Sequence, residues 1–191
     1  MLTVTENSIG PMVKKINPQI VGALIEKICS LKLQNSVDNS VQALALRAVV
    51  EALPRPVPGA MQGKEVNEAY GSVSRVLIPR FLGHPSPSSR PTTGLLNLED
   101  PNSDAVDVLI ELVRCFGPIL QSFEIEALHS AVVTILDKDR GNSVVKKRAV
   151  VALSMLAHYL PDELLADFIG RSVEVLSSDN IKDQTRRLYI T

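Results

Sequence analysis

The stretch that decides the fold is residues 143–161, which read SVVKKRAVVALSMLAHYLP. Its apolar residues recur at helical spacing through Ala152, Leu153 and Leu156. Leu160-Pro161 ends this helix, because proline lacks the backbone N–H that a helix interior needs. The same kind of proline stop occurs at Gly10-Pro11, Leu53-Pro54 and Gly117-Pro118.

These prolines recur with a regular period. Pro11 and Pro54 are 43 residues apart, as are Pro118 and Pro161, whereas Pro54 and Pro118 are 64 apart. The excess in the middle interval matches the length of one polar, proline-rich stretch, residues 83–102. A helical unit of roughly 40–47 residues is typical of HEAT and armadillo repeats.

Superposing the prolines aligns three helices position by position. The equivalent sets are Ala45, Leu109 and Ala152; Leu46, Ile110 and Leu153; Val49, Val113 and Leu156; and Ala52, Phe116 and Tyr159. We expect these helices, at 41–53, 104–116 and 143–159, to be the second members of successive helix pairs. The expected first members span 17–31, 66–82, 122–136 and 162–176, and further helices are expected at 9–16 and 184–190. The sequence therefore predicts an all-α fold: one right-handed HEAT/armadillo-type solenoid of about four helix pairs over residues 1–191.

Both ends of this solenoid read as internal repeats. Terminal repeats normally carry a polar outer face, since an apolar one would meet water. We therefore expect the solenoid to be incomplete at both ends. Either the chain is a piece of a larger solenoid, or another polypeptide completes the stack. Within the chain, residues 83–102 form an expected mobile insert, because their proline- and serine-rich composition favours disorder.

Composition excludes several classes of protein. The net charge is −1, from 20 basic and 21 acidic side chains, so no basic surplus points to nucleic acid. No apolar run approaches the roughly 18 residues of a membrane span. Hydrophobic residues make up 45% of the chain but aromatic residues only 4%, which predicts an aliphatic core. Cys29 and Cys115 fall within apolar helical patterns, and we expect both to be reduced core residues of an intracellular protein.

No pattern in the sequence indicates catalysis. Nucleophile-elbow, zinc-protease, Cys-x-x-Cys and phosphate-loop motifs do not occur. His129 and His158 lie on different expected helices, and we expect neither to be a metal ligand. We predict that the protein is not an enzyme and uses no cofactor or metal.

Charged clusters are the candidate binding residues. One basic cluster lies at the start of the helix expected at 143–159 and another lies near residue 191: Lys146, Lys147, Arg148, Lys182, Arg186 and Arg187. The first cluster has two interpretations, an inter-repeat ladder of charges or a contact patch for an acidic partner. The acidic stretch Glu99, Asp100, Asp104, Asp107 and Glu111 is expected to be solvated.

Four segments carry a family resemblance. Residues 143–153, SVVKKRAVVAL, resemble the V-R-K-R-T-I-I-A-L-G-H-L helix of the cullin-associated, neddylation-dissociated proteins. Residues 9–16, IGPMVKKI, resemble that family's L-G-P-L-V-S-K-V. Residues 45–54 resemble its segment ending G-E-L-P-P, and residues 185–190, TRRLYI, resemble T-T-R-T-Y-I-Q. The order and spacing agree from about Ile9 to Thr191, although residues 83–102 are longer than their counterpart.

The resemblance implies an N-terminal portion of a HEAT-repeat exchange factor for cullin–RING ubiquitin ligases. Such an arm lies on the RING-bearing part of unneddylated cullin and screens the neddylation lysine, while a C-terminal arm competes with substrate receptors. The implied partners are a cullin–RING complex and a companion HEAT chain that continues the solenoid, in cytoplasm and nucleus, with no nucleic acid or membrane involved. A generic HEAT adaptor, in nuclear transport or phosphatase scaffolding, is the alternative.

Overall fold

The computed structural model describes residues 17–31, 36–83, 94–137 and 143–177, together with Ser8, Pro11 and Met12. Every regular element in these ranges is helical, which confirms the predicted all-α class. The elements are α2 (Pro18–Cys29), α3 (Ser36–Ala52), α4 (Lys64–Ser72), the π-helical turn η1 (Val73–Leu77), α5 (Ile78–Leu82), α6 (Ser103–Phe116), the 3-10 turn η2 (Gly117–Ile119), α7 (Ser122–Asp137), α8 (Ser143–Leu156) and α9 (Asp162–Ser177). The helix expected at 184–190, and most of the one at 9–16, lie outside the described residues.

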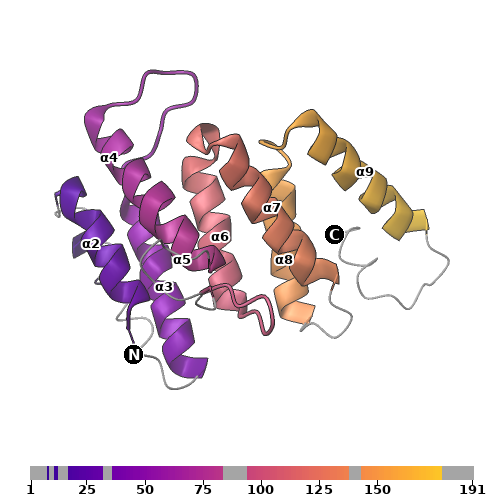
Figure 1. The fold of residues 1–191 in the computed structure, drawn as a ribbon, viewed down its shortest axis with the longest axis horizontal. Helices are drawn as coiled ribbons and strands as arrows, with labels where there is room; N and C mark the ends of the chain where they lie inside the picture. Colours follow the sequence, from indigo (N-terminus) through magenta and orange to yellow (C-terminus); the bar gives the residue numbers. More distant parts are fainter. Residues whose placement is uncertain are drawn as a thin grey trace.

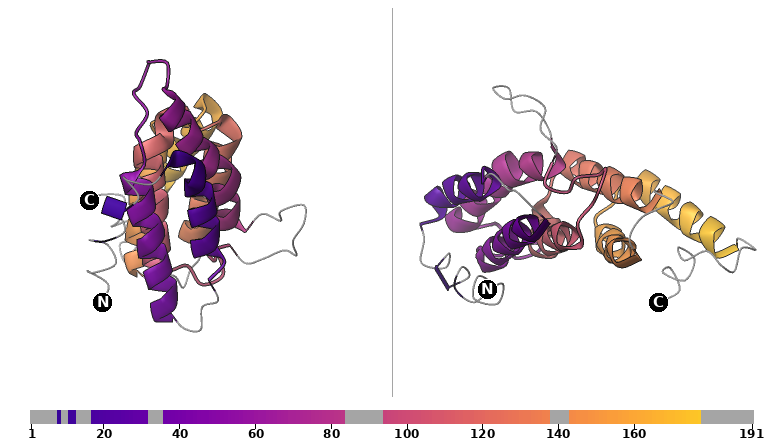
Figure 2. Two further views of the ribbon diagram at one scale, coloured as in Figure 1. Left: turned by 90° about the vertical axis from the view of Figure 1, so that its left-hand side faces the viewer. Right: turned by 90° about the horizontal axis from the view of Figure 1, so that it is seen from below.

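The helices form two layers (Figure 1). The first layer contains α2, the continuous α4–η1–α5 segment, α7 and α9, and the second contains α3, α6 and α8. Within the second layer α6 packs against both α3 and α8, and across the layers α2 packs on α3 and α7 on α8. Figure 2 shows the first layer curving around the second. First and second members of the predicted pairs thus separate into different layers.

The aligned positions form the core between these layers. Val49, Val113 and Leu156 are each fully buried. Ala45, Leu109 and Ala152 are also buried, so two of the four aligned sets occupy equivalent core positions. In the other two sets, Ile110, Ala52 and Tyr159 are only partly buried. Burial of this aliphatic surface is the main force that holds consecutive helix pairs together.

The helix expected at 66–82 begins two residues earlier, at Lys64, and contains a π-helical turn. At the end of this turn, Ile78 N–H donates to the carbonyl of Val73, five residues back. Pro79 follows immediately and has no N–H to give to the carbonyl four residues before it, so the local helix geometry adjusts at this point. Gly83 ends the segment with a left-handed φ of 77°, a conformation that glycine adopts without steric cost.

Residues 94–102 of the expected mobile insert contact α5. Leu96 N–H donates to the carbonyl of Phe81 at 3.1 Å, and the Leu96 side chain is buried. Gly94 permits this approach, because a Cβ there would lie 2.4 Å from the Phe81 carbonyl oxygen. The prediction from composition overlooked Leu95 and Leu96, whose backbone N–H groups donate to the carbonyls of Arg80 and Phe81 in α5. Residues 84–93 of the insert lie outside the described residues.

The remaining helix bounds agree with the sequence to different degrees. α2 ends at Cys29, two residues before the predicted Leu31, and α3 begins at Ser36, five residues before the predicted start at Val41. α6, α7 and α9 begin and end within one residue of the expected positions. α8 ends at Leu156, three residues before the predicted Tyr159, and the chain continues as a turn up to Leu160.

Candidate interaction surface

The metal-ligating side chains and the two free cysteines bear on whether the described part of the chain holds a metal ion or a reactive thiol. Among the described residues, no group of three or more His, Cys, Asp and Glu side chains is placed to hold a metal ion. Burial raises the pKa of the Cys29 and Cys115 thiols to about 12, and a thiol that stays protonated is a poor nucleophile. No helix in the described ranges is both long and apolar enough to cross a membrane.

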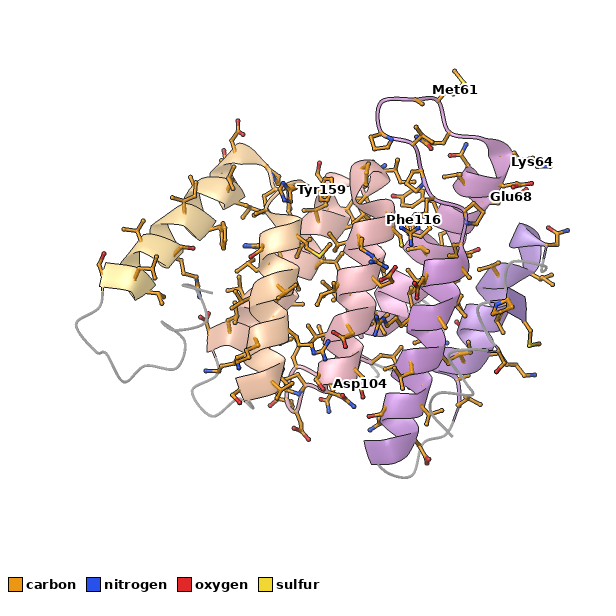
Figure 3. The ribbon with its side chains drawn as sticks, turned by 180° about the vertical axis from the view of Figure 1, so that it is seen from behind. Met61, Lys64, Glu68, Asp104, Phe116 and Tyr159 are labelled. Carbon is orange, nitrogen blue, oxygen red and sulfur yellow. The ribbon has the colours of Figure 1, made fainter. Side chains whose placement is uncertain are left out.

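Charged side chains connect the three helices of the second layer. Figure 3 shows these helices, and its labels Asp104 and Phe116 mark the two ends of α6. We call this set the arginine-covered face. It comprises Arg47, Glu51, Arg55, Asp107, Glu111, Arg114 and Arg148.

Asp107 of α6 forms an ion pair with Arg148 of α8. The carboxylate is almost inaccessible, with 9% of its side chain exposed, whereas 43% of the Arg148 side chain is exposed. Burial raises the pKa of Asp107, and the nearby Arg148 and Arg47 guanidinium groups oppose that rise. The ion pair therefore links α6 to α8, two consecutive helices of the second layer. It also offsets the cost of burying the negative charge of Asp107.

Glu111 lies one turn further along α6 and is even more buried, with 4% of its side chain exposed. Arg114 donates to it at 2.7 Å, and Arg55, just beyond α3, approaches it at 3.8 Å. The Cys115 Sγ donates to the same carboxylate at 3.1 Å. Arg114 also lies 3.9 Å from Glu51 of α3, which extends the network across the α3–α6 boundary.

The exposed fractions of the side chains show which charge this face presents to solvent. The two α6 carboxylates are buried, while the Arg55, Arg114 and Arg148 side chains are 51%, 46% and 43% exposed. Glu51, with 54% of its side chain exposed, is the acidic exception. Solvent and any partner therefore meet mainly guanidinium groups, whose planar donors suit carboxylate recognition.

The structure places the three residues of the first predicted basic cluster in different environments. Lys146 is buried, at 7% exposure, and Arg148 turns toward Asp107, which is the arrangement expected of an inter-repeat ladder. Lys147 is exposed. The other three predicted residues, Lys182, Arg186 and Arg187, lie outside the described residues. The expectation that Asp107 and Glu111 are solvated is wrong, because α3 and α8 pack on both sides of α6.

Sequence reasoning missed the arginines of α3 and α6. Arg47, Glu51 and Arg55 follow each other at intervals of four, and Glu111 and Arg114 at an interval of three. Such spacings place side chains on one helix face, and this was the available signal. The partners across helices are more than 40 positions apart in the sequence and leave no local pattern.

A second unusual surface lies on α8 and α9, where large apolar side chains are exposed. We call it the α8–α9 apolar face, and its members are Val144, Val151, Ile169, Val173 and Leu176. Each is 37% to 57% exposed, and α9 has no fully buried residue within its bounds. On each helix these side chains recur at intervals of three, four or seven residues and so share one helix face. Contiguous exposed apolar side chains commonly mark contact surfaces.

Comparison with known proteins gives one family and one relative. The family described as "Cullin-associated NEDD8-dissociated protein 1 N-terminal part" matches residues 20–191. The chain is similar to a curated protein of Emericella nidulans, "Cullin-associated NEDD8-dissociated protein 1, N-terminal part", with 40% identity over 189 residues. That alignment covers 95% of this chain and 55% of the relative, so the chain spans about half the relative's length. No solved structure matches the chain.

Proposed function

Because the chain belongs to the family of cullin-associated NEDD8-dissociated protein 1 N-terminal parts, we propose that it is a non-catalytic assembly factor for cullin–RING ubiquitin ligases. It binds unneddylated cullin–RING and helps to exchange substrate receptors, in the cytoplasm and the nucleus. The observation that carries this proposal is the 40% identity to the Emericella nidulans relative over nearly the whole chain.

The proposed mechanism is steric. A HEAT-type solenoid arm lies along the RING-bearing part of the cullin and covers the lysine to which NEDD8 would be attached. The alternating layers and the 43-residue period support this architecture. No bond is made or broken, so affinity depends on the area and complementarity of the contact.

The arginine-covered face is the surface that we assign to the cullin–RING contact. Its guanidinium groups are held in place by ion pairs to Asp107 and Glu111, so little side-chain entropy is lost when they bind carboxylates. Exposed Lys147, next to Arg148 on α8, extends the basic surface.

We assign the α8–α9 apolar face to a companion HEAT-repeat chain, or to further repeats of the same solenoid. Val151 and Val173 are exposed, and a further helix pair packed on α8 and α9 would bury such side chains as internal repeats do. The relative's greater length is consistent with additional repeats beside this surface.

Affinity purification from cells tests the proposal. The tagged chain should recover cullins, RING subunits and a second HEAT protein, identified by mass spectrometry, and the cullin should be mainly unneddylated. Recovery of nuclear-transport or phosphatase subunits with no cullin would overturn the proposal in favour of a generic HEAT adaptor.

A further inference from the structure

A groove runs between α7 and α9 of the first layer and is lined also by Leu153 of α8, but its lining residues are not members of the arginine-covered face. Its volume is about 500 Å³, within the size range of binding clefts. Its apolar lining comes from α7, α8 and α9: Val133, Leu153, Leu164 and Phe168. Phe168 packs only partly against the core and leaves part of its ring accessible.

The two helices that border the groove run parallel. Glu126 of α7 and Glu163 of α9 both line it near the starts of their helices, whereas Asp137 and Arg171 form an ion pair further along. The lining extends from Pro161, just before α9, to Arg171, which is about 15 Å at the rise of an α-helix. An occupant helix of two to three turns matches this length.

The rim of the groove is acidic. Three carboxylates line it, from Glu126, Glu163 and Asp167, and all three residues are exposed. Of the basic groups in the lining, Arg171 is already paired with Asp137. Burial, with a further contribution from Arg171, lowers the pKa of His129, so its imidazole is neutral near pH 7.

We propose that the α7–α9 groove is a docking site for a short amphipathic helix of a partner protein, one with apolar anchors flanked by lysine or arginine. The apolar lining takes the anchors at positions i, i+3 or i+4, and i+7, as in other helix-in-groove complexes. Glu126 on one wall and Glu163 and Asp167 on the other attract the basic flanks. The partner binds the first layer while the second layer is occupied, so this site can add a component to the assembly without competing for the arginine-covered face.

The test is a fluorescence-anisotropy titration of the full chain with a labelled helical peptide of about three turns that carries leucines at these anchor positions and flanking lysines. Two further peptides replace the lysines by glutamates or the leucines by serines. The lysine–leucine peptide should bind at least about tenfold more tightly than either of them, and more weakly as salt is raised.

Substitutions locate the binding. Glu126→Lys and Asp167→Lys, one on each wall, should each weaken the lysine–leucine peptide about tenfold. Glu65→Lys makes the same charge change at an exposed position of α4 and should leave affinity within about twofold. Circular dichroism of each variant confirms that its helices are retained.

The proposal would be overturned by equal binding of all three peptides, by no binding at all, or by a loss of binding in Glu65→Lys equal to that in the groove variants. A combined Lys182→Glu, Arg186→Glu and Arg187→Glu variant tests the chain's own basic residues as occupants. Tighter peptide binding by that variant would show that this chain already fills its groove, which excludes the partner assignment. Because the probe contains no cullin, failure here is separate from failure of the cullin–RING proposal.

Discussion

The hydroxyl of Tyr70 on α4 donates a 2.6 Å hydrogen bond to Oε2 of Glu124 on α7. The same oxygen accepts from the backbone N–H of Gln121, the residue just before α7, at 2.8 Å. The buried Glu124 carboxylate therefore holds the first turn of α7 and links α7 to α4. Among the described residues, the other oxygen, Oε1, has no hydrogen-bond partner. A buried carboxylate with few partners makes each remaining hydrogen bond important for stability.

Tyr70→Phe should therefore lower the free energy of unfolding by about 1–3 kcal/mol, because it takes a donor from a buried charged acceptor. Tyr159→Phe makes the same chemical change and should cost less than about 1 kcal/mol. Urea denaturation of both variants measures the difference. Equal losses would show that the Tyr70–Glu124 bond contributes nothing specific.

The same contact predicts a pH dependence at the alkaline end. Burial, followed by the hydrogen bond to Glu124, raises the pKa of Tyr70 from 10.0 to about 12. Between these values the unfolded chain has lost the phenolic proton and the folded chain keeps it, so stability falls as pH rises through this range. The free energy of unfolding should fall less steeply in Tyr70→Phe than in the parent over the same interval. Identical slopes would contradict the raised pKa.

Arg148→Met should destabilise the fold by about 1–3 kcal/mol, since it leaves the buried Asp107 carboxylate without its ion-pair partner. The pKa of Asp107 should rise further, because the opposing effect of Arg148 is removed. The deficit should shrink as pH falls and the carboxyl becomes protonated. Adding Asp107→Asn should restore much of the loss, as a double-mutant cycle by thermal unfolding can measure. A strictly additive double variant would argue against the pair.

Two glycines should respond in opposite directions to alanine. A Cβ at Gly117 would lie 2.3 Å from the Tyr159 ring, so Gly117→Ala should cost about 1–3 kcal/mol through overpacking. At Gly71, inside α4, a Cβ meets only the flexible end of Arg75, and Gly71→Ala should add up to about 1 kcal/mol through helix propensity. Melting temperatures below and above that of the parent, respectively, are the expected result. A stable Gly117→Ala variant would contradict the close packing of η2 on Tyr159.

Leu96→Ala should cost about 2–5 kcal/mol, as expected for removing a fully buried leucine. Leu95→Ala, at the neighbouring half-buried position, should cost clearly less. Chemical denaturation of the two variants separates these outcomes. Small and equal effects would show that residues 94–102 do not anchor to α5.

The fold was predictable because its determinants are local. Each helix is indicated by residues within one or two turns of one another, namely the stops at Pro54, Pro118 and Pro161 and apolar stripes such as Leu153–Leu156. The 43-residue period then predicts how the helices pair. The π-helical turn before Pro79 was missed because a proline in a helical pattern signals a break without saying how the helix accommodates it.

The candidate surface was only partly predictable. Lys147 has the exposure expected of a binding residue, but the arginine-covered face depends on pairs such as Asp107–Arg148, 41 positions apart. Its members appear in the sequence as ordinary charged residues, and only the stacking of α3, α6 and α8 brings them together. The burial of Glu111 was missed for the same reason.

The most direct test of the proposed function is the affinity of this chain for a purified cullin–RING complex, measured with and without attached NEDD8. The unmodified complex should bind at least about tenfold more tightly. Lys147→Glu should weaken this binding, while Lys64→Glu, the same change at an exposed first-layer position, should not. Equal affinity for the two forms of the complex, or no measurable binding to either, would contradict the proposal.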